Sequence, residues 1–79
     1  SADLTFNVYP NPSIGSFVIE HNFETPVLEI FTMDGRLVYM EELDNFKSNV
    51  STDLARGIYL LKLTDKVKNK SSNLLLELN

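Results

Sequence analysis

The amino-acid sequence predicts an all-β domain, a two-sheet antiparallel sandwich of seven strands. Three observations support this fold class. Apolar residues fall in short clusters in which every second residue is apolar, the period of a half-buried strand. Turn residues separate most of these clusters at a spacing of about 8–12 residues, as in sandwiches. No segment keeps a helical period beyond a turn or two, and the connections are too short for the crossovers that parallel strands need.

The first two strands are expected on either side of a proline-containing break. Alternating apolar residues from Leu4 to Val8 predict the first strand. The segment 10–15 then interrupts the pattern, because its two prolines cannot donate to a ladder and its glycine can adopt a positive φ. Phe17 and Ile19 follow on one face of the second strand.

The third and fourth strands are expected to form a hairpin. Thr25-Pro26 marks the boundary before the third strand, in which Leu28 and Ile30 alternate with Glu29 and Phe31. Asp34-Gly35 lies between two apolar runs and is a hairpin signal. The fourth strand is therefore expected over 36–40.

The C-terminal third contains the strongest strand signal. A short strand is expected over 49–51, and 52–57 is interpreted as one helical turn closed by a glycine. Residues 58–64 combine β-branched, aromatic and leucine residues in clean alternation. Residues 65–72 are expected to be a charged loop, and 74–78 the last strand.

The core is expected to come from the apolar face of each strand. In the 58–64 strand we place Ile58 and Leu60 in the core. The opposite face, formed by Tyr59, Leu61 and Leu63, is the alternative. The expected core residues are Phe6, Val8, Phe17, Ile19, Leu28, Ile30, Val38, Ile58, Leu60, Leu74 and Leu76.

Composition excludes several functional classes. The chain has no cysteine, which excludes a disulfide scaffold, a thiolate metal site and thiol catalysis. Eleven acidic and seven basic residues give a net charge of −4, which argues against binding to nucleic acid or anionic membranes. No run of about 18 apolar residues occurs, so no membrane span is expected. We expect one domain over 1–79, with 1–3 as a linker or cloning remnant, and no cofactor.

The single histidine, His21, is the first candidate for chemistry. It could serve as a catalytic base or a metal ligand. Catalysis also needs a nucleophile and an orienting group, and no such residues lie near it in the sequence. We therefore interpret His21 as an exposed residue at the end of a strand.

Two charged clusters could each be a binding site or have only a structural role at the surface. Glu41, Glu42 and Asp44 could supply hard oxygen ligands to calcium, but they lack the spacing of a calcium-binding loop, so a solvated loop is the preferred interpretation. A second cluster is basic and could bind an anionic partner or protect an edge strand. It consists of Lys66, Lys68 and Lys70.

Aromatic side chains could form a sugar-binding surface, but their positions in strands favour the core for most of them. They are Tyr9, Phe17, Phe23, Phe31, Tyr39, Phe46 and Tyr59.

Three sequence blocks occur in a distinctive order. The first is Val8-Tyr9-Pro10-Asn11-Pro12-Ser13, followed by Gly15 and Phe17. The second runs from Ile30 to Val38 and contains Asp34-Gly35-Arg36. The third runs from Asp53 to Leu63. In this order and at these distances, the blocks resemble the C-terminal sorting domain of the type IX (Por) secretion system of Gram-negative bacteria, over nearly the whole chain.

The resemblance implies a seven-stranded immunoglobulin-like sandwich and a non-catalytic role. It implies that the domain follows a larger cargo protein in the same chain, directs it through the periplasm and outer membrane to the cell surface or medium, and is then typically removed by a surface sortase. The implied partners are the translocon, shuttle and sortase proteins of that system. Lys66, Lys68 and Lys70 are the expected partner-steering residues. The positions that carry the resemblance are Tyr9, Pro10, Asn11, Pro12, Gly15, Asp34, Gly35, Arg36, Gly57, Tyr59 and Lys62.

A second functional hypothesis stays open on the sequence. An immunoglobulin-like or fibronectin-like module that binds carbohydrate or protein directly would share the fold, and fold alone does not decide function. An enzyme is not expected, because no nucleophile–base pair or metal-ligand set is visible.

Overall fold

The computed structural model describes residues 5–44 and 46–79, and these contain strands and turns but no helix. Leu4 and the expected linker 1–3 lie outside the described residues. Every pairing between strands is antiparallel. The strands are β1 (Phe6–Tyr9), β2 (Ser16–His21), β3 (Pro26–Thr32), β4 (Leu37–Glu42), β5 (Lys47–Ser51), β6 (Gly57–Asp65) and β7 (Lys70–Leu78).

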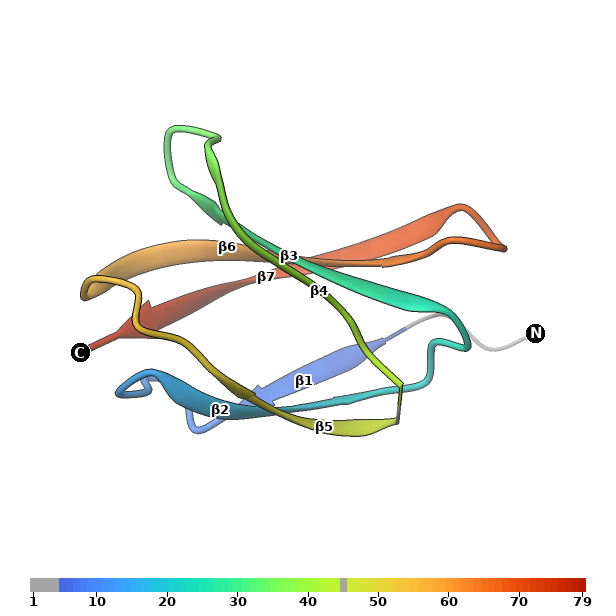
Figure 1. The fold of residues 1–79 in the computed structure, drawn as a ribbon, viewed down its shortest axis with the longest axis horizontal. Helices are drawn as coiled ribbons and strands as arrows, with labels where there is room; N and C mark the ends of the chain where they lie inside the picture. The colour runs from blue at the N-terminus through green and yellow to red at the C-terminus, as the bar shows by residue number, and fades with distance from the viewer. Residues whose placement is uncertain (1–4, 45) are drawn as a thin grey trace.

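The strands form two facing sheets, so the predicted sandwich is confirmed (Figure 1). One sheet has the order β1-β2-β5, and the other has the order β4-β3-β6-β7. In constant-type immunoglobulin domains the fourth strand pairs within the first sheet. Here β4 pairs with β3 instead, which leaves β4 and β7 as the edges of the four-stranded sheet.

Tyr59 supplies a feature that is characteristic of immunoglobulin-like sandwiches. It is the third residue of β6, and its hydroxyl donates a hydrogen bond to the carbonyl of Ala55, four residues upstream. This contact has the form of a tyrosine corner, which fixes the chain where it passes from one sheet to the other. Tyr59 is itself buried.

The core lies between the sheets and uses the alternative face of the 58–64 strand. Tyr59, Leu61 and Leu63 are buried, whereas Ile58 is 52% exposed and Leu60 is only half-buried, so placing these two in the core was wrong. Of the other expected core residues, six are buried and Val8, Val38 and Leu74 pack against them from half-buried positions. The core residues that were not anticipated are Phe23, Leu43, Val50 and Leu78.

The predicted helical turn over 52–57 is wrong. The segment is irregular and extended, because it crosses from β5 to β6 and makes tertiary contacts in place of local ones. The N–H of Thr52 donates to the carbonyl of Gly15 at 2.8 Å, which continues the pairing of β2 with β5. Gly15 has φ +114°, and a Cβ there would lie 2.9 Å from the carbonyl oxygen of Thr52, so the approach requires glycine.

The predicted charged loop over 65–72 is shorter than expected. β6 continues to Asp65 and β7 begins at Lys70, so only 66–69 form the turn. Asn69 closes the turn with φ +56°, a conformation that asparagine tolerates better than most residues. Its N–H donates to the carbonyl of Asp65 at 2.8 Å. The loop was overestimated because the lysine and the two serines at the start of β7 carry no apolar signal.

Candidate functional site

The first sequence block lies against the C-terminal half of β7. The side-chain amide of Asn11 donates to the carbonyl of Leu75 at 2.9 Å, and its oxygen accepts from the N–H of Glu77 at 3.1 Å. Ser13 N–H donates to the carbonyl of Glu77 at 2.9 Å, and Asn79 N–H donates to the carbonyl of Ser13 at 2.8 Å. Residues 11–13 therefore pair with β7 like a short additional strand.

The neighbours of Asn11 in this block face solvent. Tyr9 ends β1 and is 39% exposed, and Pro10 and Pro12 are exposed as well. The two prolines flank the residue that makes the contact with β7. Because proline has no N–H, neither can contribute a backbone donor to this pairing.

The third block is the ladder partner of β7. Gly57 pairs with Leu78 at one end of the hairpin, and Lys62 pairs with Asn73 near the other. Tyr59 points into the core, while Lys62 belongs to the outward-facing set of β6. This block therefore positions β7 along most of its length.

The second block forms the turn between β3 and β4, which projects from the end of the four-stranded sheet (Figure 1). The N–H of Gly35 donates to the carbonyl of Thr32 at 2.9 Å, and the N–H of Thr32 donates to the carbonyl of Arg36 at 2.8 Å. The Thr32 hydroxyl bonds to the Asp34 carboxylate, which lowers the pKa of Asp34. These bonds fix the conformation of the turn, which lines a hollow together with residues of β6 and β7.

β7 has one closed and one open half along its outer edge. Backbone groups of an edge strand alternate between the neighbouring strand and the open side. The groups of Leu75, Glu77 and Asn79 that bond to residues 11–13 identify the outward-facing set, which also includes Ser71 and Asn73. Within the described parts of the chain, no partner occupies the edge beside Ser71 and Asn73. With respect to residues 5–44 and 46–79, the outward N–H and C=O groups of these two residues are therefore free.

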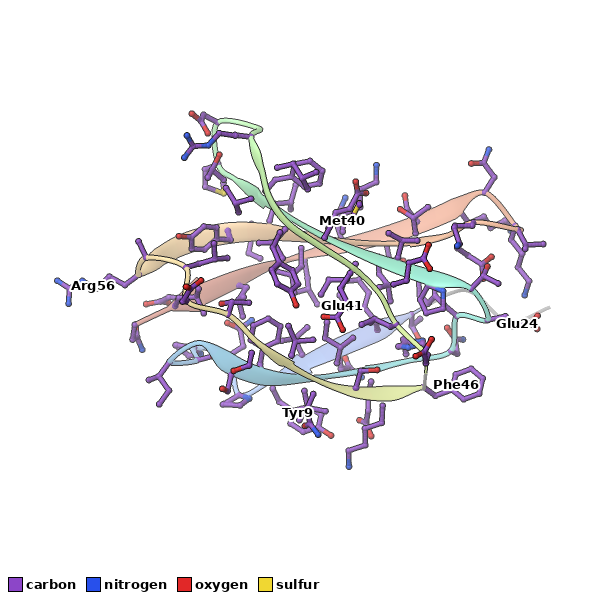
Figure 2. All side chains as sticks on the ribbon, viewed as in Figure 1. Tyr9, Glu24, Met40, Glu41, Phe46 and Arg56 are labelled. Carbon is purple, nitrogen blue, oxygen red and sulfur yellow. The ribbon has the colours of Figure 1, made fainter. Side chains whose placement is uncertain are left out.

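The outer face of the four-stranded sheet carries an apolar row. Leu75 pairs with Leu60, Leu60 with Phe31, and Phe31 with Leu37, so one apolar side chain from each strand lies across the sheet. Leu75 is 53% exposed and Leu37 is 45% exposed. Met40 lies on the same outer side, where Figure 2 shows it directed away from the other sheet.

The turn after β6 is organised by Asp65, a fully buried carboxylate that the sequence analysis did not single out. It accepts hydrogen bonds from the N–H groups of Lys68 at 2.9 Å and Val67 at 3.1 Å, and from the Thr25 hydroxyl at 2.8 Å. The N–H of Glu24 donates to its other oxygen at 3.2 Å. These hydrogen bonds, chiefly the one from the N–H of Lys68, hold the pKa of Asp65 well below its usual range. Burial acts in the opposite direction and is outweighed.

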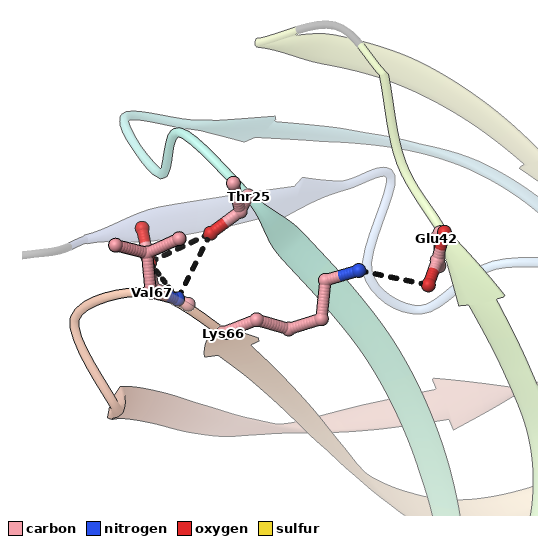
Figure 3. Close-up of polar contacts among 5 residues, drawn as sticks. Thr25, Glu42, Lys66 and Val67 are labelled. Atoms are coloured by element: carbon pink, nitrogen blue, oxygen red, sulfur yellow. Dashed lines mark hydrogen bonds and ion pairs between the residues drawn. The ribbon is translucent and has the colours of Figure 1, made fainter.

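The three lysines of this turn have different surroundings. Lys66 forms an ion pair with Glu42 at 2.9 Å, and Thr25 accepts from the N–H of Val67 beside it (Figure 3). Lys68 and Lys70 are exposed and form no ion pair with the described residues. Only these two remain available to an anionic partner without breaking an existing contact.

His21 is buried rather than exposed, which corrects the sequence-based interpretation. Its Nδ1 accepts a hydrogen bond from the N–H of Phe23 at 3.1 Å, and its ring contacts those of Phe23 and Phe46. His21 lies in phase with Phe17 and Ile19, and this period could have revealed its burial. Its contacts give it a structural role.

The acidic cluster does not form a joint site. Glu41 accepts a hydrogen bond from the Tyr39 hydroxyl at 2.6 Å. This bond is the main reason why the pKa of Tyr39 is raised to about 12. Glu42 instead pairs with Lys66. Among residues 5–44 and 46–79, no three histidine or acidic side chains lie close enough together to hold a metal ion. The same residues include no helix of the length and apolarity needed to cross a membrane.

Comparison with known families places the chain in one of them. Residues 7–77 match the family described as the secretion system C-terminal sorting domain. The chain belongs to this family. The sorting domain functions as a C-terminal secretion signal of the type IX system, so the predicted family and function are confirmed. A protein that carries this sorting domain is exported across the outer membrane. Comparison with curated proteins gave no match.

Proposed function

We propose that the folded sandwich of this sorting domain is the signal, and that the secretion machinery reads it at β7. The cargo is a larger protein in the same polypeptide, which passes through the periplasm to the cell surface or the medium. The translocon and its shuttle proteins recognise the domain, and a surface sortase removes it afterwards. The domain itself catalyses no reaction.

The convergence of the three sequence blocks on β7 carries this proposal. The first block pairs with the C-terminal half of its edge through Asn11 and Ser13. The third block is its ladder partner. The second block lies at a hollow that Ser71 and Asn73 also line. Residues of the first and third blocks thus contact one strand and the second block lies close to it, while Gly15 of the first block supports the other sheet through Thr52.

Charge at the β6–β7 turn supports the same location. Lys68 and Lys70 are exposed cations on a chain whose net charge is −4. They would steer an acidic partner toward β7 and raise the rate of association more than the affinity. Lys66 would contribute less, because Glu42 already neutralises it.

A secretion assay tests the proposal. The chain is fused to the end of a periplasm-directed reporter in a bacterium that has the type IX machinery, and the secreted fraction is measured. We expect export that is lost in a strain without the translocon. A reporter that stays in the periplasm, while a known sorting domain at the same position is exported, would contradict the proposal.

Matched charge variants test the steering. Lys68→Gln with Lys70→Gln should slow export and leave the fold intact. Asn7→Asp with Asn49→Asp changes the net charge by the same amount at exposed positions of the other sheet. Equal slowing by both pairs would show that net charge, and not the β6–β7 turn, sets the rate.

A further inference from the structure

The open half of the β7 edge is a short, well-defined stretch. Ser71 and Asn73 offer two N–H and two C=O groups outward, and the contacts of Asn11 and Ser13 begin at Leu75. An added strand would therefore pair over about five residues before meeting the closed half. Free backbone groups of this kind bind an extended chain through main-chain hydrogen bonds.

A hollow lies beside the open edge on the outer face of the sheet. It has a volume of about 430 Å³ and lies between the β3–β4 turn and the outward side chains of β6 and β7. Leu60 and Phe31 supply an apolar floor, while Ser71 and Asn73 line the side nearest the edge. A strand paired with the edge would place every second side chain on this face. One long apolar or aromatic side chain could then reach over Ser71 and Asn73 into the hollow.

Lysine side chains lie on and near this position. Lys62 lines the hollow, Lys68 lies in the turn 66–69, and Lys70 begins β7 on the face opposite to Ser71 and Asn73. None of these three forms an ion pair with the described residues. A cationic side chain, that of Lys62, thus lies on the face of the open edge, beside its ladder neighbour Glu29. Acidic residues on either side of the apolar anchor would complement it.

We infer that the open half of β7 binds an extended segment of a partner protein in which an aromatic or long apolar residue is flanked by acidic residues. The segment pairs with Ser71 and Asn73, its apolar side chain occupies the hollow, and the carboxylates on the same face of the segment lie toward Lys62. This inference rests on the proposed reading of the domain at β7 and names the chemistry of the segment that reads it.

Titration with a synthetic peptide tests the inference. The probe is the capped peptide Asp-Thr-Phe-Thr-Asp, added to the isotope-labelled chain while amide resonances are followed. We expect saturable shifts at the amides of Ser71 and Asn73 and slower hydrogen exchange at both. Replacing Phe in the peptide by Ala, or both Asp residues by Lys, should weaken binding by about tenfold or more. Shifts confined to other surfaces, or equal binding of all three peptides, would overturn the inference.

A pair of variants at one position isolates the backbone contribution. Asn73→Pro removes an outward N–H and leaves the ladder with β6 intact, because proline is tolerated on an edge strand where its nitrogen faces solvent. Asn73→Ala keeps that N–H and serves as the control. We expect the proline variant to lose peptide binding and the alanine variant to keep it, with both showing the circular dichroism of the parent chain. Equal binding by both folded variants would overturn the inference.

Two further results separate this inference from the secretion function. If the reporter fusion is exported but the peptide does not bind, the strand-pairing site is wrong and the sorting function stands. If the peptide binds but the fusion is not exported, the sorting function of this chain falls and the site stands. Concentration-dependent dimers that Asn73→Pro abolishes would identify a second copy as the occupant and would also overturn the inference.

Discussion

The side-chain oxygen of Asn11 accepts a hydrogen bond from the N–H of Glu77, across 66 residues of sequence. The same side chain donates to the carbonyl of Leu75. These bonds close half of an edge strand that would otherwise be exposed to pairing with other chains. The sorting motif at residues 9–13 thus both ties the N-terminal segment to the last strand and defines which part of that strand stays open.

Loss of the Asn11 side chain should loosen the closed half of the β7 edge, which then keeps only its backbone bonds to Ser13 among the described residues. We expect Asn11→Ala to lower the free energy of unfolding by about 1–2 kcal/mol, because two hydrogen bonds are lost. The amide of Glu77 should exchange faster with solvent. Asn11→Asp keeps the side-chain acceptor and loses the donor. Its free energy of unfolding should therefore lie between those of the parent chain and Asn11→Ala. Unchanged exchange at Glu77 in Asn11→Ala would show that the contact is not formed in solution.

A side chain at position 15 should destabilise the sandwich. Gly15 combines a positive φ with an approach that would place a Cβ 2.9 Å from the carbonyl oxygen of Thr52. Chemical denaturation should show that Gly15→Ala costs about 1–3 kcal/mol. Gly35→Ala is the matched control, because Gly35 also has a positive φ but no atom within 4 Å of its Cβ position. Equal losses in both variants would mean that backbone conformation, and not the contact with Thr52, sets the cost.

Stability should depend on acid through Asp65. Hydrogen bonds, chiefly from the N–H of Lys68, depress the pKa of this carboxyl in the folded state. Its contribution is therefore fully present above the unfolded-state pKa of about 3.9 and is lost as the pH falls below it. We expect Asp65→Asn to lower the Tm by more than about 5 °C at neutral pH. The difference from the parent chain should shrink as the pH falls below about 4. Asp44→Asn, at an exposed carboxylate, should show neither effect.

Thr52 offers a stabilising substitution. Its Oγ1 is buried and has no hydrogen-bond partner among the described residues. Replacing the hydroxyl by a methyl group removes an unsatisfied polar atom at nearly constant volume. We expect Thr52→Val to raise the free energy of unfolding by about 1 kcal/mol in denaturant titrations. Thr52→Ala also removes the side-chain methyl group and should gain less. A loss of stability in Thr52→Val would indicate that the hydroxyl has a partner in solution.

The strand pattern of the sequence predicts most of the fold but not the orientation of β6. Alternation in β2 and β3 identifies Phe17, Ile19 and Leu28 as core residues, because the other face of these strands carries polar residues such as Glu20 and Glu29. In β6 each face combines apolar and polar residues, with Lys62 and Thr64 on one face and Asp65 on the other, so local sequence does not distinguish Leu60 from Leu61. Only pairing within the sheet decides which face meets the other layer.

Long-range contacts explain the remaining differences from prediction. The segment 52–57 has the composition of a helical turn, yet the bond from Thr52 to Gly15 keeps it extended. Asp65 was interpreted as a loop residue because its charge suggested solvent, although it continues the buried face of β6. No local pattern indicates that Asn11 contacts β7, since the contact depends on how the sheets are assembled. The sequence blocks could thus be identified by resemblance, but the contacts of the first and third blocks with β7 could not.

Whether the folded sandwich or the linear sequence is the signal can be measured directly. Ile19→Ala and Leu28→Ala each create a cavity in the core and should cost about 2–5 kcal/mol, so together they should unfold so small a domain. Both positions lie outside the three sequence blocks and outside β6 and β7. The secreted fraction of the reporter fusion is compared with the folded fraction of the isolated chain for the parent, both single variants and the double variant. We predict that export falls in parallel with the folded fraction. Export of the unfolded double variant at the level of the parent would contradict the account.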